Sequence, residues 1–333
     1  LFSIILFFIV LNLLVLYKDS TPLTYDAEGY FEESVKYFQI LNQEPKNIFL
    51  VFFEEKYDIE TRPPVFMLVS TPFYWTFGIT EDVARITNFL FYIIIIIFTY
   101  LIGKELGNKK IGLLGSIILS TIPLFFGFLR MYYTDFAAAT FITMSFYFLI
   151  KNKYFQERKF SIYLGIILGF GLLTKKLFIL VIIGPLIYQI FSSKKNKIFF
   201  KNISIILILV LLISAPWYLS QKSTIFFWLN ESSNISLSKN DIDVFSFNGF
   251  NYYLFAMKNM ILHDIMFFVF IFSFIGLFFI KNKHKQNLIL WIIIPYFILS
   301  LVANKVPRYF LGLLPIISLI IALILYRIRY KFI

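Results

Sequence analysis

Long apolar runs separated by short polar turns fill most of this chain, and they predict its helices. A helix that crosses a membrane needs about 20 mainly apolar residues. Runs of this kind occur at residues 1–17, 82–102, 111–128, 133–150, 160–173, 177–191, 202–219, 264–280, 287–303 and 308–326. The pattern predicts an all-α polytopic membrane protein with these ten spans. The short runs at 160–173 and 177–191 could instead form a tilted or re-entrant pair.

Two long connections interrupt the series, at residues 18–82 and 220–263. The first contains an apolar stretch, 65–78, and the two prolines before it suit the first turn of a helix, where a missing N–H costs little. If this stretch crossed the membrane, every later turn would change sides, so we interpret it as an interfacial helix. We expect residues 1–333 to form one membrane domain, with a short piece trimmed before the first residue and no soluble C-terminal domain.

Composition and charge confirm the membrane class and give the spans an orientation. The chain is 59% hydrophobic and 15% charged, whereas soluble domains are about 25% charged. Short loops that are rich in Lys and Arg stay on the cytoplasmic side. Such segments hold 17 of the 31 Lys and Arg residues and two acids, and they are 103–110, 151–159, 192–201, 281–286 and the tail from Tyr326. Ten spans place all of them inside and both long connections outside, so the net charge of +12 is a topology signal and does not indicate nucleic-acid binding.

Residue types exclude several kinds of site. The chain has no cysteine, which rules out disulfides and thiolate metal centres. Its two histidines, His263 and His284, have no patterned ligands between them, and we interpret both as solvated loop residues. No phosphate-binding glycine loop, dinucleotide fingerprint or HExxH pattern occurs. We therefore expect no metal and no other cofactor.

The outer turns place carboxylates and cations together at helix ends. Candidate residues in this set are Asp26, Glu28, Tyr30, Arg62, Arg85, Arg130, Asp135, Lys175, Lys305, Arg308 and Tyr309. Arg and Lys bind phosphate oxygens and can neutralise a phosphate leaving group. A carboxylate can take the proton of an attacking hydroxyl. The set would suit a reaction between a membrane-bound phosphate and a hydroxyl.

Charges at helix ends are also common as solvated caps or as anchors that extend to the membrane surface. We favour this reading for Glu32, Glu33, Lys36 and the acidic residues within 54–60. For Asp26, Arg62, Asp135 and Arg308 the spacing alone leaves both readings open.

The order of the motifs resembles the GT-C glycosyltransferases, and within them the family of protein O-mannosyltransferases and aminoarabinose transferases. Asp26 with Tyr30 resembles the family's Asp-Glu-x-x-Tyr motif, although Ala27 holds the second position and the next acid is Glu28. Further matches follow in family order, at Arg62-Pro63-Pro64, Gly78 to Arg85, Arg130 to Asp135, Gly171 to Lys175, and Lys305 to Tyr309.

The resemblance implies a polyprenyl-phosphate sugar as donor, a hydroxyl acceptor on a protein, lipid or glycan, and a direct inverting displacement without a metal. It also implies action on the extracytoplasmic face of a plasma membrane, with a bacterium or archaeon as the expected source. Asp26 takes the place of the catalytic base. Asp135 takes that of a second acid that holds substrate or orients Arg130.

Other residues receive roles from the resemblance as well. Arg62, Lys305 and Arg308 would clamp the donor phosphate. Possible substrate contacts come from Glu28, Tyr30, Arg85, Arg130, Lys175 and Tyr309. We expect the lipid tail to lie in an apolar groove near 65–78. We expect the second connection, with its aromatic residues Phe226, Phe227, Trp228 and Tyr252, to cover the site.

Two other classes of function stay open, a transporter and a non-catalytic assembly or scaffold protein, and a flippase or ligase of lipid-linked glycans is the nearest rival. A transporter usually places charged residues near the middle of the bilayer, whereas the acids here avoid the span interiors. A flippase or ligase of lipid-linked glycans would share the outer cations, but it has no evident need for the Asp26–Tyr30 element.

Overall fold

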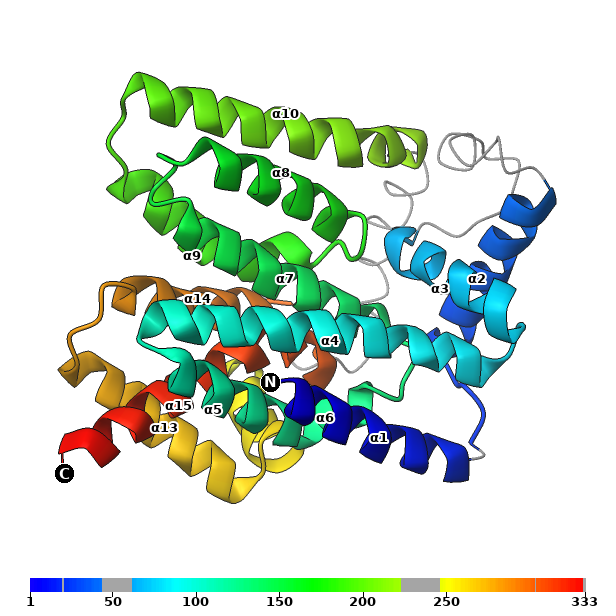
Figure 1. Ribbon diagram of the computed structural model, residues 1–333, viewed down its shortest axis with the longest axis horizontal. Helices are drawn as coiled ribbons and strands as arrows, with labels where there is room; N and C mark the ends of the chain where they lie inside the picture. Colours follow the sequence, from blue (N-terminus) through cyan, green and yellow to red (C-terminus); the bar gives the residue numbers. More distant parts are fainter. Residues whose placement is uncertain (20, 44–61, 223–245, 303, 332–333) are drawn as a thin grey trace.

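The computed structural model describes residues 1–19, 21–43, 62–222, 246–302 and 304–331, and each regular element within these ranges is a helix. The helices form one elongated bundle (Figure 1). In chain order they are α1 (Phe2–Lys18), α2 (Asp26–Gln43), α3 (Val65–Phe77), α4 (Glu81–Leu106), α5 (Lys109–Thr121), α6 (Pro123–Phe128), α7 (Thr134–Lys151), α8 (Arg158–Leu172), α9 (Phe178–Ser192), α10 (Lys197–Ser220), α12 (Phe247–Ala256), the π-helix η4 (Met257–Ile261), α13 (Asp264–Phe279), α14 (Lys285–Ser300), the 3₁₀-helix η5 (Pro307–Leu313) and α15 (Leu314–Lys331).

Each of the ten predicted spans contains a helix, and two of them are interrupted. The run 111–128 breaks at Pro123 into α5 and α6, because proline has no N–H to continue the helical bonding. The run 308–326 begins as the tighter η5 and continues as α15. Among the described residues, α4, α10 and the combined segment Pro307–Arg329 are long and apolar enough to cross a membrane individually. The chain is a polytopic, all-α membrane protein.

α15 is the central helix of the bundle. Its residues from Leu314 to Ile324 are buried, as expected for a helix that is apolar on all sides. It packs against α5, α13 and α4, and the adjoining η5 packs against α7. This packing fixes the start of the last helix, where Arg308 lies, in the interior of one end of the bundle.

The basic turns come together at the opposite end. Lys151 at the end of α7 pairs with Glu105 of α4 at 3.1 Å. Asn282, before α14, donates a hydrogen bond to the carbonyl of Leu106 at 2.8 Å. Asn196, before α10, donates to the side chain of Gln156 at 3.0 Å. Four turns that the sequence assigns to the cytoplasmic side are therefore neighbours in space, on the left of Figure 1.

The first connection folds as a helical pair that carries Asp26. α2 buries Ser34, Tyr37 and Phe38 against α3, and the Ser34 hydroxyl is hydrogen-bonded to the Tyr74 hydroxyl at 2.6 Å. α3 corresponds to the predicted helix over 65–78. Its Ser70 hydroxyl is hydrogen-bonded to that of Tyr132 at 2.6 Å, which joins the pair to the turn before α7.

The second connection also contains helical structure, which the sequence reading did not predict. α12 and η4 occupy its last part, and Tyr253 stacks on Phe310 of η5 with ring centroids 5.2 Å apart. The predicted covering role of Phe226, Phe227 and Trp228 concerns residues that lie outside those described.

Candidate active site

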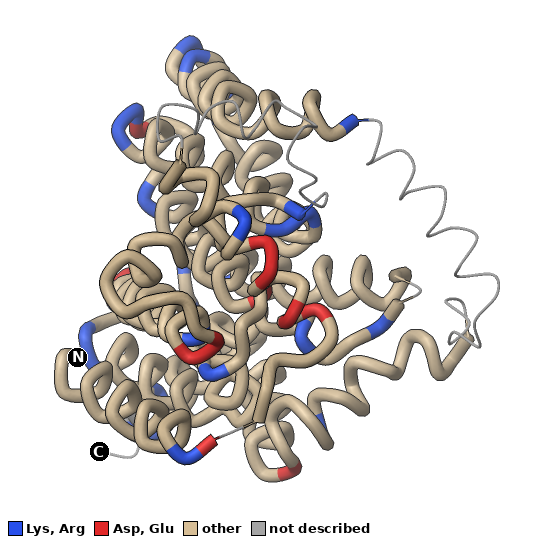
Figure 2. The backbone as a smooth tube through the Cα atoms, turned by 90° about the vertical axis from the view of Figure 1, so that its right-hand side faces the viewer, with Lys and Arg blue, Asp and Glu red and all other residues tan. Residues whose placement is uncertain are grey.

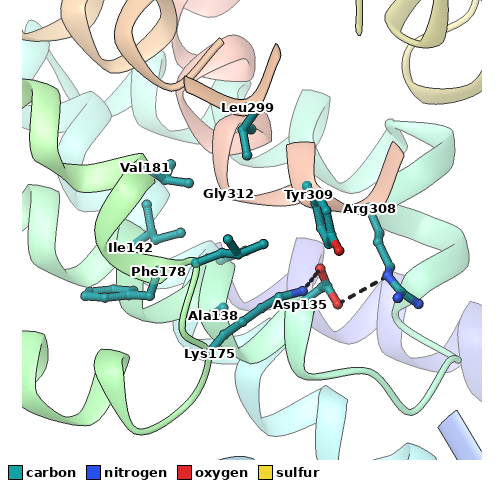
Figure 3. A pocket seen from close by; sticks show the side chains of 12 residues that line it. Asp135, Ala138, Ile142, Lys175, Phe178, Val181, Leu299, Arg308, Tyr309 and Gly312 are labelled. Atoms are coloured by element: carbon teal, nitrogen blue, oxygen red, sulfur yellow. Dashed lines mark hydrogen bonds and ion pairs between the residues drawn. The ribbon is translucent and has the colours of Figure 1, made fainter. Parts of the chain in front are cut away.

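Four predicted site residues meet at the end of the bundle that carries α2 and α3. Asp26 begins α2, Asp135 lies in the first turn of α7, Lys175 lies between α8 and α9, and Arg308 lies in η5. The Arg308 guanidinium pairs with Asp26 and also approaches Asp135, with Nε and Oδ2 3.8 Å apart. Lys175 pairs with the other oxygen of Asp135. The result is an alternating acid–base network, Asp26–Arg308–Asp135–Lys175, part of which Figure 3 shows.

Local structure explains where the two acids lie. Tyr25 adopts a left-handed φ of 55°, and this turn starts α2 with Asp26 as its first residue. Asp135 is the second residue of α7. Carboxylates are favoured in the first turn of a helix because the free N–H groups there carry partial positive charge. The two helix starts therefore bring two carboxylates to Arg308.

The two acids differ in their exposure. The Asp135 side chain is 3% exposed, whereas that of Asp26 is 45% exposed. Asp135 Oδ2 and Arg308 Nε are both buried without a hydrogen-bond partner, and their separation is longer than a hydrogen bond. Asp135 is thus the buried centre of the network, and Asp26 is the acid that a molecule from the aqueous side can reach.

Aromatic rings hold the cations in place. The Arg308 guanidinium lies 4.7 Å from the centre of the Tyr133 ring, and Lys175 Nζ lies 4.8 Å from that of Tyr309. Arg62 lies 4.7 Å from the centre of the Tyr30 ring. These are favourable cation–π distances. Burial raises the pKa of Tyr30 to about 12, so its hydroxyl stays protonated.

A cationic cavity of about 230 Å³ adjoins the network. Arg62, Lys175 and Lys176 line it together with the hydroxyl residues Tyr30, Thr134 and Thr174, and none of the described residues that line it is an acid. Burial lowers the pKa of Lys175, while Asp135 acts in the opposite direction. A bound anion would stabilise the charged lysine in the same way, so the cavity suits a phosphate group.

A narrower cavity, with about 20 Å³ of internal space, continues from Lys175 into the bundle. Asp135, Lys175 and Arg308 form its polar end, and its other walls are Ala138, Ala139, Ile142, Leu177, Phe178, Val181, Leu299, Tyr309 and Gly312. Figure 3 shows these side chains from α7, α9, α14 and η5 around it. A cationic compartment and an apolar one therefore share Lys175 and Leu177.

The comparisons with known proteins bear on this arrangement. Residues 61–219 match the family described as dolichyl-phosphate-mannose-protein mannosyltransferase. ArnT from Cupriavidus metallidurans, solved with bound undecaprenyl phosphate, matches 97% of this chain with a TM-score of 0.72 and 18% identity. The chain has the fold of ArnT, and its residues 61–219 are similar to the mannosyltransferase family. The same ArnT in its apo state gives a TM-score of 0.68 at 15% identity over 97% of this chain.

A less similar solved structure also matches. The oligosaccharyltransferase of Archaeoglobus fulgidus, solved with Zn and sulfate, covers 82% of this chain at 13% identity with a TM-score of 0.50, and 41% of its own chain is covered. The chain spans about 60% of the length of the ArnT structures. No curated protein sequence matches it. At these identities the solved structures establish the fold alone.

The structure brings together seven predicted residues, Asp26, Tyr30, Arg62, Asp135, Lys175, Arg308 and Tyr309. Lys305, predicted as part of the phosphate clamp, is buried and donates to the carbonyl of Val302 at 2.8 Å. It lines neither of the two cavities. Glu28 lies on the exposed face of α2.

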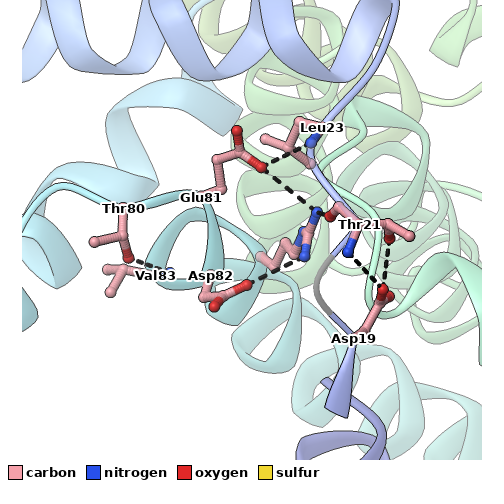
Figure 4. Close-up of polar contacts among 8 residues, drawn as sticks. Asp19, Thr21, Leu23, Thr80, Glu81, Asp82 and Val83 are labelled. Atoms are coloured by element: carbon pink, nitrogen blue, oxygen red, sulfur yellow. Dashed lines mark hydrogen bonds and ion pairs between the residues drawn. The ribbon is translucent and has the colours of Figure 1, made fainter. Parts of the chain in front are cut away.

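Arg85 lies in a separate cluster, and Figure 4 labels its partners Thr21, Glu81 and Asp82. It pairs with Asp82 at 3.1 Å and donates to the carbonyl of Thr21 at 2.6 Å. Glu81, 3.6 Å from Arg85, accepts a hydrogen bond from the Leu23 N–H at 2.7 Å. These contacts fasten the start of α4 to the segment between α1 and α2, so Arg85 positions α2 from a distance and does not line the site.

Arg130 is bonded to Asn12 and not to Asp135, the partner that the sequence suggested. Its guanidinium donates to Asn12 of α1 at 2.7 Å and lies 4.8 Å from the centre of the Phe126 ring. Asp135 is bonded to Lys175 and faces Arg308. The suggestion that Asp135 orients Arg130 is therefore wrong.

The sequence reading missed Glu33, Gly29 and Lys176. Glu33 is not a solvated residue: its side chain is 3% exposed and lies 3.4 Å from Arg62. The spacing of Asp26, Tyr30 and Glu33 at helical intervals places them on one face of α2, which is the signal that could have found it. Gly29 lets Arg62 approach, because a Cβ there would lie 2.5 Å from Arg62 Nη1.

His284 also differs from its prediction as a solvated residue. It is half-buried, and its Nε2 is buried without a hydrogen-bond partner. Burial lowers its pKa to about 4, so the ring is neutral at physiological pH.

Proposed function

We propose that this protein transfers a sugar from a polyprenyl-phosphate donor to a hydroxyl acceptor. The observation that carries the proposal is the Asp26–Arg308–Asp135–Lys175 network, which lies between a cationic cavity and an apolar one. The cationic cavity is large enough for a phosphate group, whereas the apolar one has room for no more than a water-sized group, so the lipid chain would lie outside it. The bound undecaprenyl phosphate named for the ArnT structure supports this class of donor.

The donor phosphate would bind Arg62, Lys175 and Lys176 in the cationic cavity. Arg308 is linked to this cavity through Asp135 and Lys175, and its guanidinium would turn toward the same phosphate. As the bond between the anomeric carbon and the phosphate oxygen breaks, negative charge grows on that oxygen, and the fixed cations stabilise it. Lys and Arg side chains would supply this charge without a metal ion.

Asp26 would act as the general base. Its carboxylate is half-exposed, and Arg308 occupies it in the free protein. A phosphate that binds Arg308 would compete with Asp26 for the guanidinium. The Asp26 carboxylate oxygens would then be free to accept a hydrogen bond from the acceptor hydroxyl. The hydroxyl oxygen would then bond to the anomeric carbon while its proton moves to Asp26 and the lipid phosphate leaves. A single displacement of this kind inverts the anomeric centre.

The charge distribution supports an extracytoplasmic site. Figure 2 faces the end that holds α2 and α3, and it shows acidic segments beside basic ones near the middle of this face. The basic turns lie at the other end and belong in the cytoplasm by the positive-inside rule. We place the protein in a plasma membrane, with the network facing away from the cytoplasm.

Reconstitution tests the proposal directly. Purified protein in liposomes is given a polyprenyl-phosphate sugar and an acceptor fraction from the cell envelope, and mass spectrometry follows the lipid. We expect free polyprenyl phosphate to appear together with a glycosylated acceptor, with no effect of a chelator. Donor that crosses the bilayer intact would indicate a flippase and refute transfer.

A further inference from the structure

A second polar cavity, of about 500 Å³, lies at the cytoplasmic end of the bundle, far from Asp26. Side chains from five helices, the turn between α7 and α8 and the turn before α14 line it, and those that matter here are Glu105, Lys151, Lys153, Gln189, Lys283 and Asn287. None of these residues takes part in the proposed transfer. The cavity therefore needs an explanation of its own.

Two buried amides form its deepest polar surface. Gln189 of α9 is 2% exposed and Asn287 of α14 is 1% exposed, and the side-chain oxygen of each is buried without a hydrogen-bond partner. His284 Nε2 lines the same cavity and is also unpartnered. Buried polar atoms in folded proteins are nearly always satisfied, so three unpartnered groups around one cavity indicate a polar ligand. Amides and a neutral imidazole offer both donors and acceptors, which suits hydroxyl groups.

The charged residues lie nearer the surface and give the cavity an excess of one cation. Lys151 pairs with Glu105 at 3.1 Å, and Lys153 pairs with Glu157 at 2.8 Å. Among the ion pairs of the described residues, none includes Lys283, whose side chain is exposed at the rim. The two ion pairs are neutral overall, so Lys283 leaves the cavity with one positive charge. This charge favours a ligand with a single negative charge.

The wall between α7 and α8 has an unusual backbone. Lys153, Tyr154 and Phe155 have φ values of 48°, 60° and 64°, and none of them is glycine. Three such residues in succession are rare, because the side chain crowds the following carbonyl in this region. Asn202 holds the turn by donating to the Phe155 carbonyl at 2.8 Å, and Ser193 donates to that of Tyr154 at 3.0 Å. The turn directs Lys153 and Tyr154 to the cavity, and strain of this kind often accompanies a binding site.

We propose that this cavity binds a phosphodiester that carries free hydroxyl groups, with the phosphate on Lys283 and the hydroxyls on Gln189 and Asn287. Such a group occurs as the headgroup of an anionic phospholipid of the inner leaflet, and it also occurs as a soluble glycerol phosphodiester. Phe160 and Ile150 at the same cavity provide apolar contacts for the first carbons of a lipid chain. The site is separate from the donor site and does not depend on the proposed transfer.

Binding of defined probes to the purified full chain in detergent tests the site. The probes are short-chain phosphatidylglycerol, short-chain phosphatidylcholine, and glycerophosphoglycerol, which is the first headgroup without its acyl chains. Native mass spectrometry or thermophoresis gives each Kd. We expect phosphatidylglycerol to bind at least tenfold more tightly than phosphatidylcholine. Equal binding of glycerophosphoglycerol and phosphatidylglycerol would identify a soluble ligand, and binding of the lipid alone would identify the membrane as the source.

Variants connect that affinity to the cavity. Lys283→Gln and Asn287→Leu should each weaken phosphatidylglycerol binding at least fivefold. Lys201→Gln, which removes an exposed lysine of α10 outside the cavity, should not change it. Lys283 is at the surface, so its variant decides the question even if Asn287→Leu does not fold. Equal affinities of Lys283→Gln and Lys201→Gln, or equal binding of the two lipids to the unaltered protein, would overturn the proposal.

Discussion

The two ends of the bundle both combine lysines with carboxylates, but they bury different groups. At the α2 end the Asp135 carboxylate is 3% exposed and lies between Lys175 and Arg308. At the end where the basic turns meet, Lys151 and Glu105 are 30% and 26% exposed, and the deeply buried groups are the neutral amides of Gln189 and Asn287. Burial of a charge costs several kcal/mol per ion, whereas burial of a neutral amide without its hydrogen bond costs about 1–3 kcal/mol. The network therefore carries the larger cost, and it lies where, in the proposed transfer, charge would act on a reacting phosphate.

Removal of one acid from each end should show this difference most strongly. Asp135→Ala leaves Lys175 and Arg308 without their shared buried anion, so we expect a loss of about 3–5 kcal/mol in the free energy of unfolding. Glu105→Ala breaks a partly exposed pair and should cost about 1 kcal/mol or less. Denaturant unfolding in detergent measures both. Equal losses would show that the two ends do not differ in the way described.

A change in guanidinium geometry should separate the network from the structural arginine cluster. Arg308→Lys keeps the positive charge but cannot contact both carboxylates through a planar fork. Loss of one charged hydrogen bond corresponds to about 1.5–3 kcal/mol, so we expect turnover to fall about 10- to 100-fold. Arg85→Lys should lower the melting temperature and change turnover little, because its partners fasten α4. If Arg85→Lys lost more turnover than Arg308→Lys, the active centre would lie in the Arg85 cluster and not in the Asp26–Arg308–Asp135–Lys175 network.

The close approach of Arg62 to α2 gives a smaller effect. The methyl group of Gly29→Ala would lie 2.5 Å from Arg62 Nη1, and the flexible end of the arginine would have to shift. We expect the KM for donor to rise about two- to fivefold, equivalent to roughly 0.5–1 kcal/mol, with little change in kcat. Gly127→Ala, where a Cβ meets nothing within 4 Å, is the matched control. A donor KM that responds equally to both changes would remove Arg62 from donor binding.

The cytoplasmic cavity should also give a weak pH signal. Burial lowers the pKa of His284 from 6.5 to about 4, so the unfolded chain takes up its proton at higher pH than the folded protein. This part of the stability is complete above pH 6.5 and is lost as the pH falls through 4. The imidazole is partly exposed, so we expect well below ~3 kcal/mol in total. His284→Gln should flatten the stability profile between these two pH values, and an unchanged profile would contradict the assignment.

The sequence predicted the spans well because a membrane helix requires a long apolar run, which is a local property. It also placed Asp26, Asp135, Lys175 and Arg308 at one end, because each follows or precedes a span of known direction. Their pairing could not be predicted, since it depends on how α2, α7 and η5 pack. Lys305 shows the limit: it is three residues from Arg308, but the backbone between them is not helical, so the two side chains have different neighbours.

Tertiary contacts also explain why Glu33 and the turn at 153–155 were not foreseen. Glu33 is buried because α2 packs on α3 and Arg62 returns to the same face. The left-handed turn is held by Ser193 and Asn202, which lie about 40 residues or more further along the chain. The helical spacing of Glu33 with Asp26 and Tyr30 indicates a shared face but not its burial, and the turn has no local signal, because each feature depends on a partner from another segment.

The central claim is that Asp26 takes the proton of the acceptor, and a pair of variants in the first turn of α2 tests it most directly. The measurement is the initial rate of sugar transfer in liposomes, with donor binding measured in parallel. Asp26→Asn keeps the shape of the side chain and removes the base, so transfer should fall by about 10²–10⁴-fold while donor still binds. Glu28→Gln, on the exposed face of the same turn, should stay near the unaltered rate. Near-normal transfer by Asp26→Asn would contradict the account.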